Sequence, residues 1–460
     1  MCGVVGVYGP SKAAQLAFDM MQALQHRGQE SYGLKVSHRG KIRGPNPQPG
    51  LLSPEFFNRI SGLEGRLAIA HLRYSTAGGH NPEDDQPIAY DDLAIAHNGN
   101  ITNAAELRAG LKAVGRTFVT PGSDTEPILQ LAATSQQKAI EDKFIEALGY
   151  VQGAYSITAI WKDTLIIARD PHGYRPLAIG QLGNEFYAAA SETQALERIR
   201  ATKIREVERG ELITINARGY RSRKFSSIVP DQKCLMELIY FAKPSGPIFG
   251  LKKGITWIRE EHGRLLASSE KDFNAEVVVP VPDSGVQAAI GYAAQSGIPY
   301  RMGLIRSHSA GRTFILPHPE LRARAVSQKL APVKDILKEK IVVLIDDSIV
   351  RGTTAQQIVA MVRRAGAKEV HLRIASPPIT NPCYYGIDTP TKEELIASNK
   401  TVDEVRAFLK ADSLRYLSLE DLHKPINDLE QLAGRNSCDA CFTGEYANNI
   451  PVGRLPIIRV

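Results

Sequence analysis

The chain begins with Met1-Cys2-Gly3-Val4-Val5-Gly6, a cysteine followed by a short apolar run that is typical of a buried β-strand. Removal of Met1 would make Cys2 the N-terminal residue, with a thiol and an α-amine on one residue. An α-amine titrates near ~8, so it can be the general base that activates the thiol. The plainer interpretation is that Cys2 is a small apolar residue at the start of a strand. Only the rest of the sequence can decide between these two interpretations.

Length and composition predict a globular protein of two domains. The 460 residues are 43% apolar and 23% charged, which is ordinary for a folded protein. No apolar run of the sequence approaches the ~20 residues of a membrane span, and the first residues lack the layout of a secretory signal, so we expect a cytoplasmic protein without membrane contact. The formal charge of +7 is modest and the basic residues are scattered, which favours small anionic substrates over nucleic acid.

The hydrophobic pattern changes along the chain. The first part shows short strand-like runs, for example at 67–70 and 165–168, interleaved with two helical stretches, which predicts an α+β layered domain. A polar, basic segment at 218–224 is interpreted as the crossover. Beyond it, the continuous apolar runs at 277–279 and 341–345 are typical of a parallel sheet covered on both faces. We therefore expect domains at 2–220 and 221–460.

Polar residues after Cys2 match the needs of a thiolate that cleaves a glutamine-type amide. Such a reaction requires donors for the developing oxyanion, a cation for the substrate carboxylate and an anion for its ammonium group. Asn98 and the Gly99 N–H are candidate donors. Arg73 is a candidate cation and Asp124 a candidate anion. Singly, these residues have plainer explanations as a hairpin turn, a surface cation and a helix cap, but their order after Cys2 favours amide cleavage.

The segments around these candidates form a set of motifs. They are Cys2-Gly3, Gln25-His26-Arg27-Gly28, His71 to Thr76, His97 to Asn100 and Ser123-Asp124-Thr125-Glu126. The first half thereby resembles the N-terminal-nucleophile glutaminase domain of class II glutamine amidotransferases. The resemblance implies an αββα sandwich in which Cys2 is acylated. It also implies an oxyanion hole of Asn98 and Gly99, with Arg73 binding the substrate carboxylate and Asp124 its ammonium group.

The second half carries a turn suited to a phosphorylated sugar. The apolar run at 341–345 leads into Asp346-Asp347-Ser348-Ile349-Val350-Arg351-Gly352-Thr353-Thr354. Two acidic residues at a strand end can bind ribose hydroxyls, and a glycine- and hydroxyl-rich turn at a helix N-terminus presents N–H groups to phosphate. The plainer alternative is a solvated acidic turn. The nonapeptide resembles the phosphoribosyl diphosphate signature of type I phosphoribosyltransferases, and Asp283-Ser284 fits that family's diphosphate-contacting turn.

The two domains in this order are similar to the amidophosphoribosyltransferase family. Motifs at 168–171, 175–177, 240–244, 311–314 and 385–388 agree with it. The resemblance implies that ammonia from glutamine passes along an internal path and displaces diphosphate at C1 of the phosphoribosyl group, the first step of purine synthesis. Mg²⁺ would be held by Ser284, Asp346 and Asp347. Tyr74 would couple the two sites, and Arg312 and Lys329 would join the 346–354 turn in binding phosphoribosyl diphosphate. A homotetramer and inhibition by purine nucleotides are also implied.

Four cysteines remain once Cys2 is set aside. They are Cys234, Cys383, Cys438 and Cys441. Disulfides are not expected in a reducing compartment, and four thiolates are the complement of an iron–sulfur cluster or a zinc ion. Their contexts resemble the branch of the family that carries a [4Fe–4S] cluster, which implies a structural or oxygen-sensing role. Zinc is the alternative ligand, and isolated buried cysteines are the plainer interpretation.

The chain departs from the family pattern in one loop. Before Gly311 it has Ser307-His308-Ser309 where the family usually has Asn, a basic residue and Tyr, and Ser327-Gln328 precedes Lys329 where the family usually has Arg. Because the family's basic residues are missing from this loop, the sequence is also compatible with a paralogue that uses a different phosphoribosyl acceptor. A phosphoribosyl diphosphate-sensing regulator is a further alternative, and the retention of Cys2 distinguishes an enzyme from it. Another ammonia-using synthase is disfavoured because the second half lacks an adenylating loop and a sugar-isomerase pattern, and no helix-turn-helix signal favours nucleic-acid binding.

Overall fold

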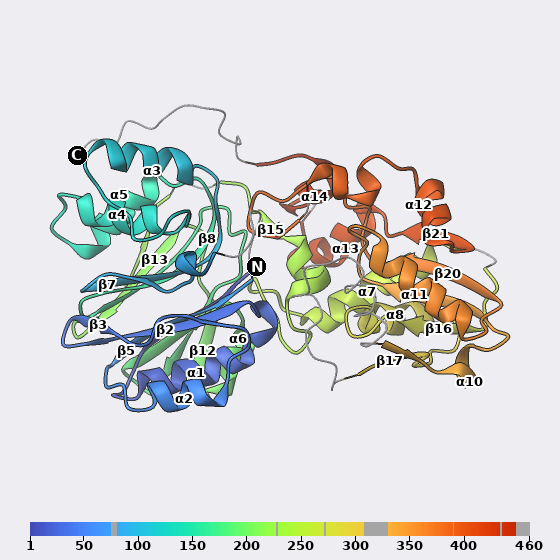
Figure 1. Cartoon of the computed structure of the whole chain (residues 1–460), viewed down its shortest axis with the longest axis horizontal. Coiled ribbons are helices and arrows are strands. Elements are labelled where there is room, and N and C mark those ends of the chain that lie inside the picture. The colour runs from blue at the N-terminus through green and yellow to red at the C-terminus, as the bar shows by residue number, and fades with distance from the viewer. Residues whose placement is uncertain are drawn as a thin grey trace.

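The computed structural model describes residues 1–74, 81–226, 229–270, 273–307, 330–389, 391–432 and 435–447. The two halves of the chain lie side by side along the long axis of the molecule (Figure 1). The first half contains two antiparallel sheets. One has the strand order β12-β10-β11-β1-β5-β2-β3, with β4 paired to β2, and the other has the order β14-β13-β9-β8-β7-β6.

The strands of the first sheet are β1 (Gly3–Tyr8), β2 (Ser31–His38), β3 (Lys41–Arg43), β4 (Gln48–Pro49), β5 (Leu67–Arg73), β10 (Ala178–Leu182), β11 (Phe186–Ala190) and β12 (Thr202–Glu206). Those of the second sheet are β6 (Ile88–Ala89), β7 (Leu93–Ile101), β8 (Gly153–Trp161), β9 (Thr164–Arg169), β13 (Glu211–Asn216) and β14 (Gly219–Lys224). The strand-like runs at 67–70 and 165–168 thus lie in β5 and β9, as predicted.

The sheets pack face to face between two layers of helices. Val4 and Ile69 of one sheet share a core with Ala96 and Ile160 of the other. The outer layers are α1 (Ala13–Ala23), α2 (Pro54–Ile60) and α6 (Thr193–Arg198) on the first sheet, and α3 (Ala104–Ala113), α4 (Glu126–Thr134) and α5 (Ile140–Gly149) on the second. The predicted αββα sandwich is confirmed. Because β1 is covered on both faces, its residues form a continuous apolar run.

Two local expectations for this half were wrong. The sequence predicted two helical stretches, whereas the described residues form six α-helices; α2 and α6 have only 7 and 6 residues, too few for a helical period to stand out. The polar segment at 218–224 is an edge strand, β14, rather than the crossover. Its charged side chains suit an exposed sheet edge, where they oppose pairing with another chain.

The second half is built on a parallel sheet of order β16-β19-β20-β21. Its strands are β16 (Val277–Pro280), β19 (Ile341–Asp346), β20 (Glu369–Ile374) and β21 (Ser413–Tyr416). One face is covered by α7 (Ile255–Ser268), α8 (Val286–Ser296) and α13 (Leu419–Glu430), and the other by α11 (Thr353–Arg364) and α12 (Val402–Leu409). The sequence prediction of a parallel sheet buried on both faces is confirmed. Since β16 and β19 are neighbours, the loops that follow them meet at one edge of the sheet.

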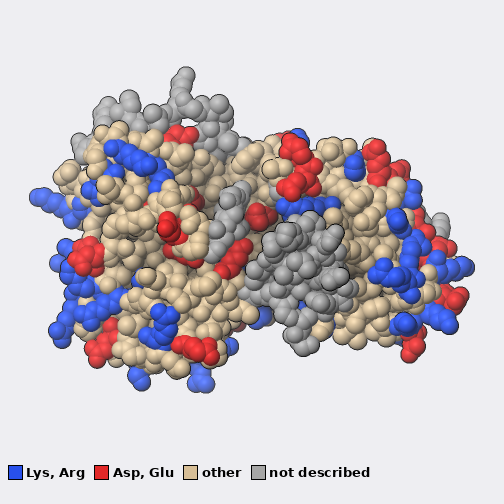
Figure 2. Space-filling view, viewed as in Figure 1, with Lys and Arg blue, Asp and Glu red and all other residues tan. Residues whose placement is uncertain are grey.

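Short elements complete this half. They are β15 (Lys233–Cys234), the π-helix η3 (Glu237–Phe241), β17 (Leu304–Arg306), β18 (Leu330–Pro332), α10 (Lys334–Leu337), β22 (Ser437–Cys438) and α14 (Ala440–Thr443). Among the described residues, no helix has the length and apolar character needed to cross a membrane. On the face shown in Figure 2, basic side chains are interspersed with acidic ones over both halves rather than gathered in one stripe.

Candidate active sites

Cys2 lies at the start of β1, next to β5, and is 8% exposed. Its backbone N–H donates to Asn98 Oδ1 at 3.1 Å, and its Sγ lies 3.6 Å from the Tyr74 carbonyl oxygen. Met1 is present in this chain, and its terminal ammonium donates to the same carbonyl at 3.2 Å. Removal of Met1 would therefore leave a free amine on Cys2 next to its own thiol.

The neighbouring histidines are engaged elsewhere. His71 Nε2 lies 3.1 Å from the His97 carbonyl, and burial, together with the charge of Arg73, lowers the pKa of His71 to about 3. His97 contacts the Thr125 hydroxyl at 3.0 Å and the Ala154 carbonyl at 3.2 Å. Both rings hold the backbone of β7 and its surroundings, so neither is placed as the base for Cys2. This arrangement agrees with an α-amine as the base.

Asn98 and Gly99 lie within β7, so the hairpin alternative is wrong for them. Asn98 is fully buried, and its Nδ2 has no hydrogen-bond partner among the described residues. An unpaired buried amide N–H destabilises the protein unless a ligand oxygen accepts a hydrogen bond from it. A Cβ on Gly99 would lie 2.0 Å from the Ala154 carbonyl oxygen, so only glycine fits there. Asn98 therefore offers an unpaired amide donor beside Cys2, and Gly99 is its neighbour in β7.

Arg73 and Asp124 are both held in place by the fold. Arg73 ends β5; its Nη1 donates to the Asp84 carbonyl at 2.7 Å, and its Nε lies 3.4 Å from Asp85 Oδ1. Asp124 accepts from the Ile101 N–H at 2.9 Å, which ties it to the end of β7. The N-cap residue of α4 is Thr125, so Asp124 is not the helix cap of the plainer interpretation. Its side chain remains 28% exposed and open to a ligand.

Arg27 is a residue near the nucleophile to which the sequence assigned no role. Its Nε donates to the Cys2 carbonyl at 3.0 Å, and its side chain is fully buried. Arg27 lies within a motif of the family, but nothing in the local sequence distinguishes a buried arginine from an exposed one. Only the tertiary structure shows that it fixes the backbone of Cys2.

Tyr74 lies where the two halves meet. Burial raises the pKa of its hydroxyl, followed by the negative charge of Asp388, while Arg351 acts in the opposite direction. Tyr240 of η3 shows the same pattern: burial, then the charges of Asp347 and of Tyr74, raise its pKa. The charges of Asp347 and Tyr74 thus both act on Tyr240, to which the sequence assigned no role because these neighbours come from distant segments.

The acidic pair ends β19. Asp346 and Asp347 are 8% and 6% exposed. The Asp347 N–H donates to Asp346 Oδ1 at 2.9 Å, and the Ser348 hydroxyl donates to Asp347 Oδ2 at 2.5 Å. Burial, and next the charge of Asp347, raise the pKa of Asp346 well above its ordinary value, while a hydrogen bond with Ser284 opposes the rise. Two adjacent buried carboxyl groups with a hydroxyl are a donor set that fits a hard divalent cation.

The turn beyond the pair leads from β19 into α11 through a left-handed glycine. Gly352 is left-handed with φ 78° and precedes α11, so Thr353 and Thr354 begin that helix. Arg351 is half exposed and pairs with Glu394 at 3.3 Å. Asp283, in the loop after β16, contacts Arg306. The predicted ligands Arg312 and Lys329 lie outside the described residues, as do Ser309 and Ser327 of the departing loop.

The four remaining cysteines lie near one another. The pairing of β15 with β22 places Cys234 opposite Cys438. Burial raises the pKa of Cys234 to about 11, with Arg175 opposing and Cys383 adding to the rise. Burial likewise raises the pKa of Cys441, followed by the charges of Cys234, Cys383 and Cys438. Even so, no three His, Cys, Asp or Glu side chains of the described residues converge tightly enough to hold one metal ion.

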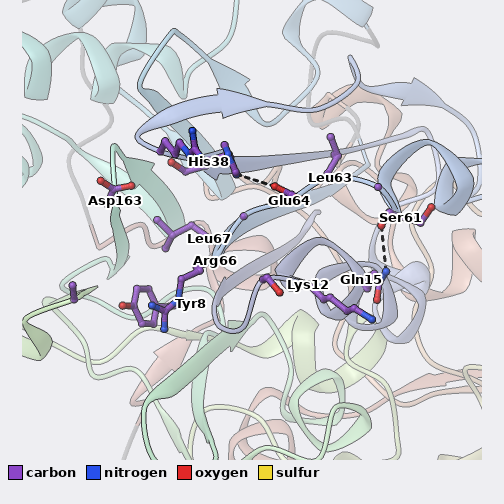
Figure 3. A pocket seen from close by; sticks show the side chains of 16 residues that line it. Tyr8, Lys12, Gln15, His38, Ser61, Leu63, Glu64, Arg66, Leu67 and Asp163 are labelled. Carbon is purple, nitrogen blue, oxygen red and sulfur yellow. Dashed lines mark hydrogen bonds and ion pairs between the residues drawn. The ribbon is translucent and has the colours of Figure 1, made fainter.

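One cavity formed by the described residues belongs to neither site. It has a volume of about 830 Å³ and lies at the opposite end of β1 from Cys2. Tyr8, Lys12, His38 and Arg66 are among its lining residues, and Figure 3 shows their side chains around it. None of the predicted catalytic or binding residues lines this cavity.

Comparisons with known proteins agree with both halves. The glutamine amidotransferase domain family matches residues 71–198. Amidophosphoribosyltransferase of Bacillus subtilis (strain 168) is 44% identical over 455 residues, 98% of this chain and 94% of the relative. Amidophosphoribosyltransferase 2, chloroplastic, of Arabidopsis thaliana is 44% identical over 450 residues, 97% of this chain and 79% of the relative. The solved glutamine phosphoribosylpyrophosphate amidotransferase from B. subtilis, complexed with ADP and GMP, has a TM-score of 0.89, 42% identity and 100% coverage of both chains.

The fold and the sites define a class II glutamine amidotransferase domain joined to a phosphoribosyltransferase-like domain. Relatives of this identity span nearly the whole chain, so the similarity covers both domains and their order. The chain belongs to the amidophosphoribosyltransferase family.

Proposed function

We propose that this chain makes 5-phosphoribosylamine, glutamate and diphosphate from phosphoribosyl diphosphate, glutamine and water, as the glutamine-dependent amidophosphoribosyltransferase of purine synthesis. The observation that carries the proposal is the buried, unpaired Nδ2 of Asn98 beside Cys2. The 44% identity to amidophosphoribosyltransferase of Bacillus subtilis supports the same reaction.

In the first half-reaction, the Cys2 thiolate attacks the glutamine carboxamide carbon. The carbonyl oxygen becomes an oxyanion that accepts from Asn98 Nδ2 and the Gly99 N–H. The α-amine of Cys2, which took the thiol proton, returns it to the amide nitrogen as the C–N bond breaks, so ammonia leaves. Water then hydrolyses the thioester to glutamate. Arg73 binds the substrate carboxylate and Asp124 its ammonium group, because each presents the opposite charge on an oriented side chain.

In the second half-reaction, ammonia attacks C1 of the phosphoribosyl group and diphosphate leaves. Asp346 and Asp347 bind the ribose hydroxyls, while the 348–354 turn binds the 5-phosphate through its N–H groups and hydroxyls. The turn at Asp283-Ser284, together with Arg312 and Lys329, binds the diphosphate, and Tyr74 couples the two sites. Asp346, Asp347 and Ser284 would hold Mg²⁺, which would supply positive charge to the leaving diphosphate.

We also propose that Cys234, Cys383, Cys438 and Cys441 hold a [4Fe–4S] cluster. The four thiols are neighbours on segments that β15 and β22 join, and Arg175 provides a buried cation beside them. A zinc ion would need four donors converging at about 2.3 Å on one point, whereas a cluster binds its thiolates at separate irons. Zinc bound by the same four thiolates is the alternative.

The expected domain boundary between residues 220 and 221 falls inside β14 (Gly219–Lys224), which belongs to the second sheet of the first half. We therefore propose that the first domain extends at least to Lys224. A homotetramer in the cytoplasm is expected from the family. The relative solved with ADP and GMP supports inhibition of this chain by purine nucleotides.

The test is an assay of phosphoribosylamine formation with glutamine and, separately, with ammonia. Both donors should support it, and replacing Asp346 and Asp347 together by Asn should abolish transfer from either donor. Glutamine hydrolysis should persist in that variant, which shows that the first domain is intact. Equal loss of hydrolysis and transfer in folded protein would contradict the assignment of the pair to the phosphoribosyl site.

A further inference from the structure

A buried cluster of charges joins the first half to the second behind Cys2. Arg27 and Arg175 come from the first half and are 1% and 0% exposed; Glu237, from η3 in the second half, is 0% exposed. Arg27 donates to both carboxylate oxygens of Glu237, at 2.8 and 3.0 Å. Arg175 Nη1 lies 3.5 Å from the same carboxylate. Glu192 accepts from Arg27 at 2.6 Å, so two cations face two anions.

This cluster acts on the nucleophile through one contact. Arg27 uses its Nη atoms for Glu237 and Glu192 and its Nε for the Cys2 carbonyl. A guanidinium held bidentately by a carboxylate has a fixed plane, so its third donor points in a fixed direction. The position of the Cys2 backbone therefore depends on a carboxylate supplied by the second half.

The helix that carries Glu237 also reaches the phosphoribosyl site. Tyr240, three residues on in η3, lies near Asp347 and Tyr74. Arg259 of α7 donates to the carbonyls of Leu238 at 2.8 Å and Ala242 at 2.8 Å, which holds η3 from its other side. One short helix thus carries the carboxylate that holds Arg27 and, three residues further on, a tyrosine near Asp347.

We propose that Glu237 is a positioning residue for glutamine cleavage, which acts through Arg27 to hold the Cys2 backbone in its reactive place. The inference rests on Cys2 being the nucleophile. It makes the glutaminase of the first half dependent on a side chain of the second half, although that side chain touches neither substrate.

The test is Glu237→Gln, which keeps the shape and removes the charge. Glutamine-dependent kcat should fall at least about tenfold, while the KM for glutamine changes little, because the residue contacts no substrate. Ammonia-dependent activity should stay within about twofold of wild type, since the Glu237 carboxylate pairs with Arg27 and Arg175 rather than with Asp346 or Asp347. Alkylation of Cys2 by iodoacetamide should slow in parallel with kcat. Unchanged glutamine-dependent kcat in folded Glu237→Gln would overturn the proposal.

Glu211→Gln is the matched control. Glu211 is 3% exposed and binds Arg205 through both carboxylate oxygens, at 2.6 and 2.9 Å, but contacts neither half of the site. The Glu211→Gln variant should have lower thermal stability than wild type but no selective loss of glutamine-dependent kcat. A similar selective loss in this control would overturn the proposal by showing that any broken buried pair has the same effect.

A double-substitution cycle separates positioning from general destabilisation. Because Glu237 acts through Arg27, adding Glu237→Gln to Arg27→Gln should cause little further loss of glutamine-dependent kcat. Losses that multiply would contradict the route through Arg27. Should Glu237→Gln fail to fold, Glu237→Asp keeps the charge and gives the same readout with a smaller expected loss. If Cys2→Ser retained glutamine cleavage, Cys2 would not be the nucleophile. That outcome differs from one in which only Glu237→Gln has no effect on glutamine-dependent kcat.

Discussion

The backbone of Gly386 packs directly against the backbone of Gly99. A Cβ on Gly386 would lie 2.6 Å from the Gly99 carbonyl carbon, and Gly386 has a left-handed φ of 102°. The adjoining residues reinforce this contact: Asn100 Nδ2 donates to the Tyr384 carbonyl at 2.9 Å, and Arg175 donates to the Tyr385 carbonyl at 2.6 Å. The segment that follows Cys383 therefore supports the strand that carries the oxyanion donors.

Gly386→Ala should displace β7 at Gly99 and weaken glutamine cleavage more than ammonia-dependent transfer. The matched control is Gly219→Ala, because Gly219 has a similar φ of 105° but nothing within 4 Å of its Cβ position. Both substitutions place a Cβ on a left-handed backbone, which destabilises the protein, but only Gly386→Ala also creates a steric clash. Steady-state rates with each nitrogen donor check this. Equal effects of the two substitutions would show that the Gly386–Gly99 contact is irrelevant to cleavage.

Asn98→Ala should lower glutamine-dependent kcat by about 10²- to 10³-fold, the usual cost of losing an oxyanion donor. Ammonia-dependent activity should be unchanged. Asn103→Ala is the control, because Asn103 is also buried but both ends of its amide are paired, with the Tyr150 carbonyl at 2.8 Å and the Gln152 N–H at 2.9 Å. The control should lose more stability than Asn98→Ala and retain its kcat. The reverse order in melting and kinetic assays would contradict the oxyanion assignment.

The stability of the protein should depend on Glu192 at acid pH. Burial opposes ionisation of Glu192, but His26 and Arg27 outweigh it and lower its pKa from 4.5 to about 2. A lowered carboxyl pKa adds stability that is present above the unfolded pKa and is lost as the pH falls toward the folded value. Glu192→Gln should therefore reduce the free energy of unfolding by about 3 kcal/mol at pH 7. In urea titrations this difference should shrink between pH 4.5 and pH 2; a constant difference would refute it.

Protein purified without oxygen should be brown, with absorption near ~400 nm and about four irons per chain. Cys438→Ser should bleach it and reduce folding yield, because Cys438 and Cys234 hold together segments far apart in sequence. Cys2→Ser is the matched control and should keep the colour. Colourless protein with one zinc would exclude the cluster but keep the four-cysteine site, and metal-free active protein would exclude both.

Much of the fold was accessible from the sequence because its signals are local. The apolar runs of β16 and β19 and the acidic turn at 346–354 occupy consecutive residues, so strand, loop and helix followed from pattern alone. Edge strand β14 was missed because its charged residues have the composition of a linker.

The site was accessible only in part. Cys2, Asn98 and Asp124 belong to short motifs whose chemistry is recognisable. By contrast, the roles of Arg27, Glu237 and Tyr240 arise from contacts between segments about two hundred residues apart, such as the pair of Arg27 with Glu237. No spacing rule in the sequence links such residues, and the amino-acid composition does not show which charged residues form a buried ion pair.

The most direct test of the account is Cys2→Ser, assayed for phosphoribosylamine with glutamine and with ammonia, after mass spectrometry of the wild-type protein. The wild-type chain should lack Met1, because the α-amine of Cys2 is the base. The variant should lose glutamine-dependent synthesis and fully retain ammonia-dependent synthesis, because only amide cleavage uses the thiol. Glutamine-dependent synthesis at the wild-type rate in Cys2→Ser would contradict the account.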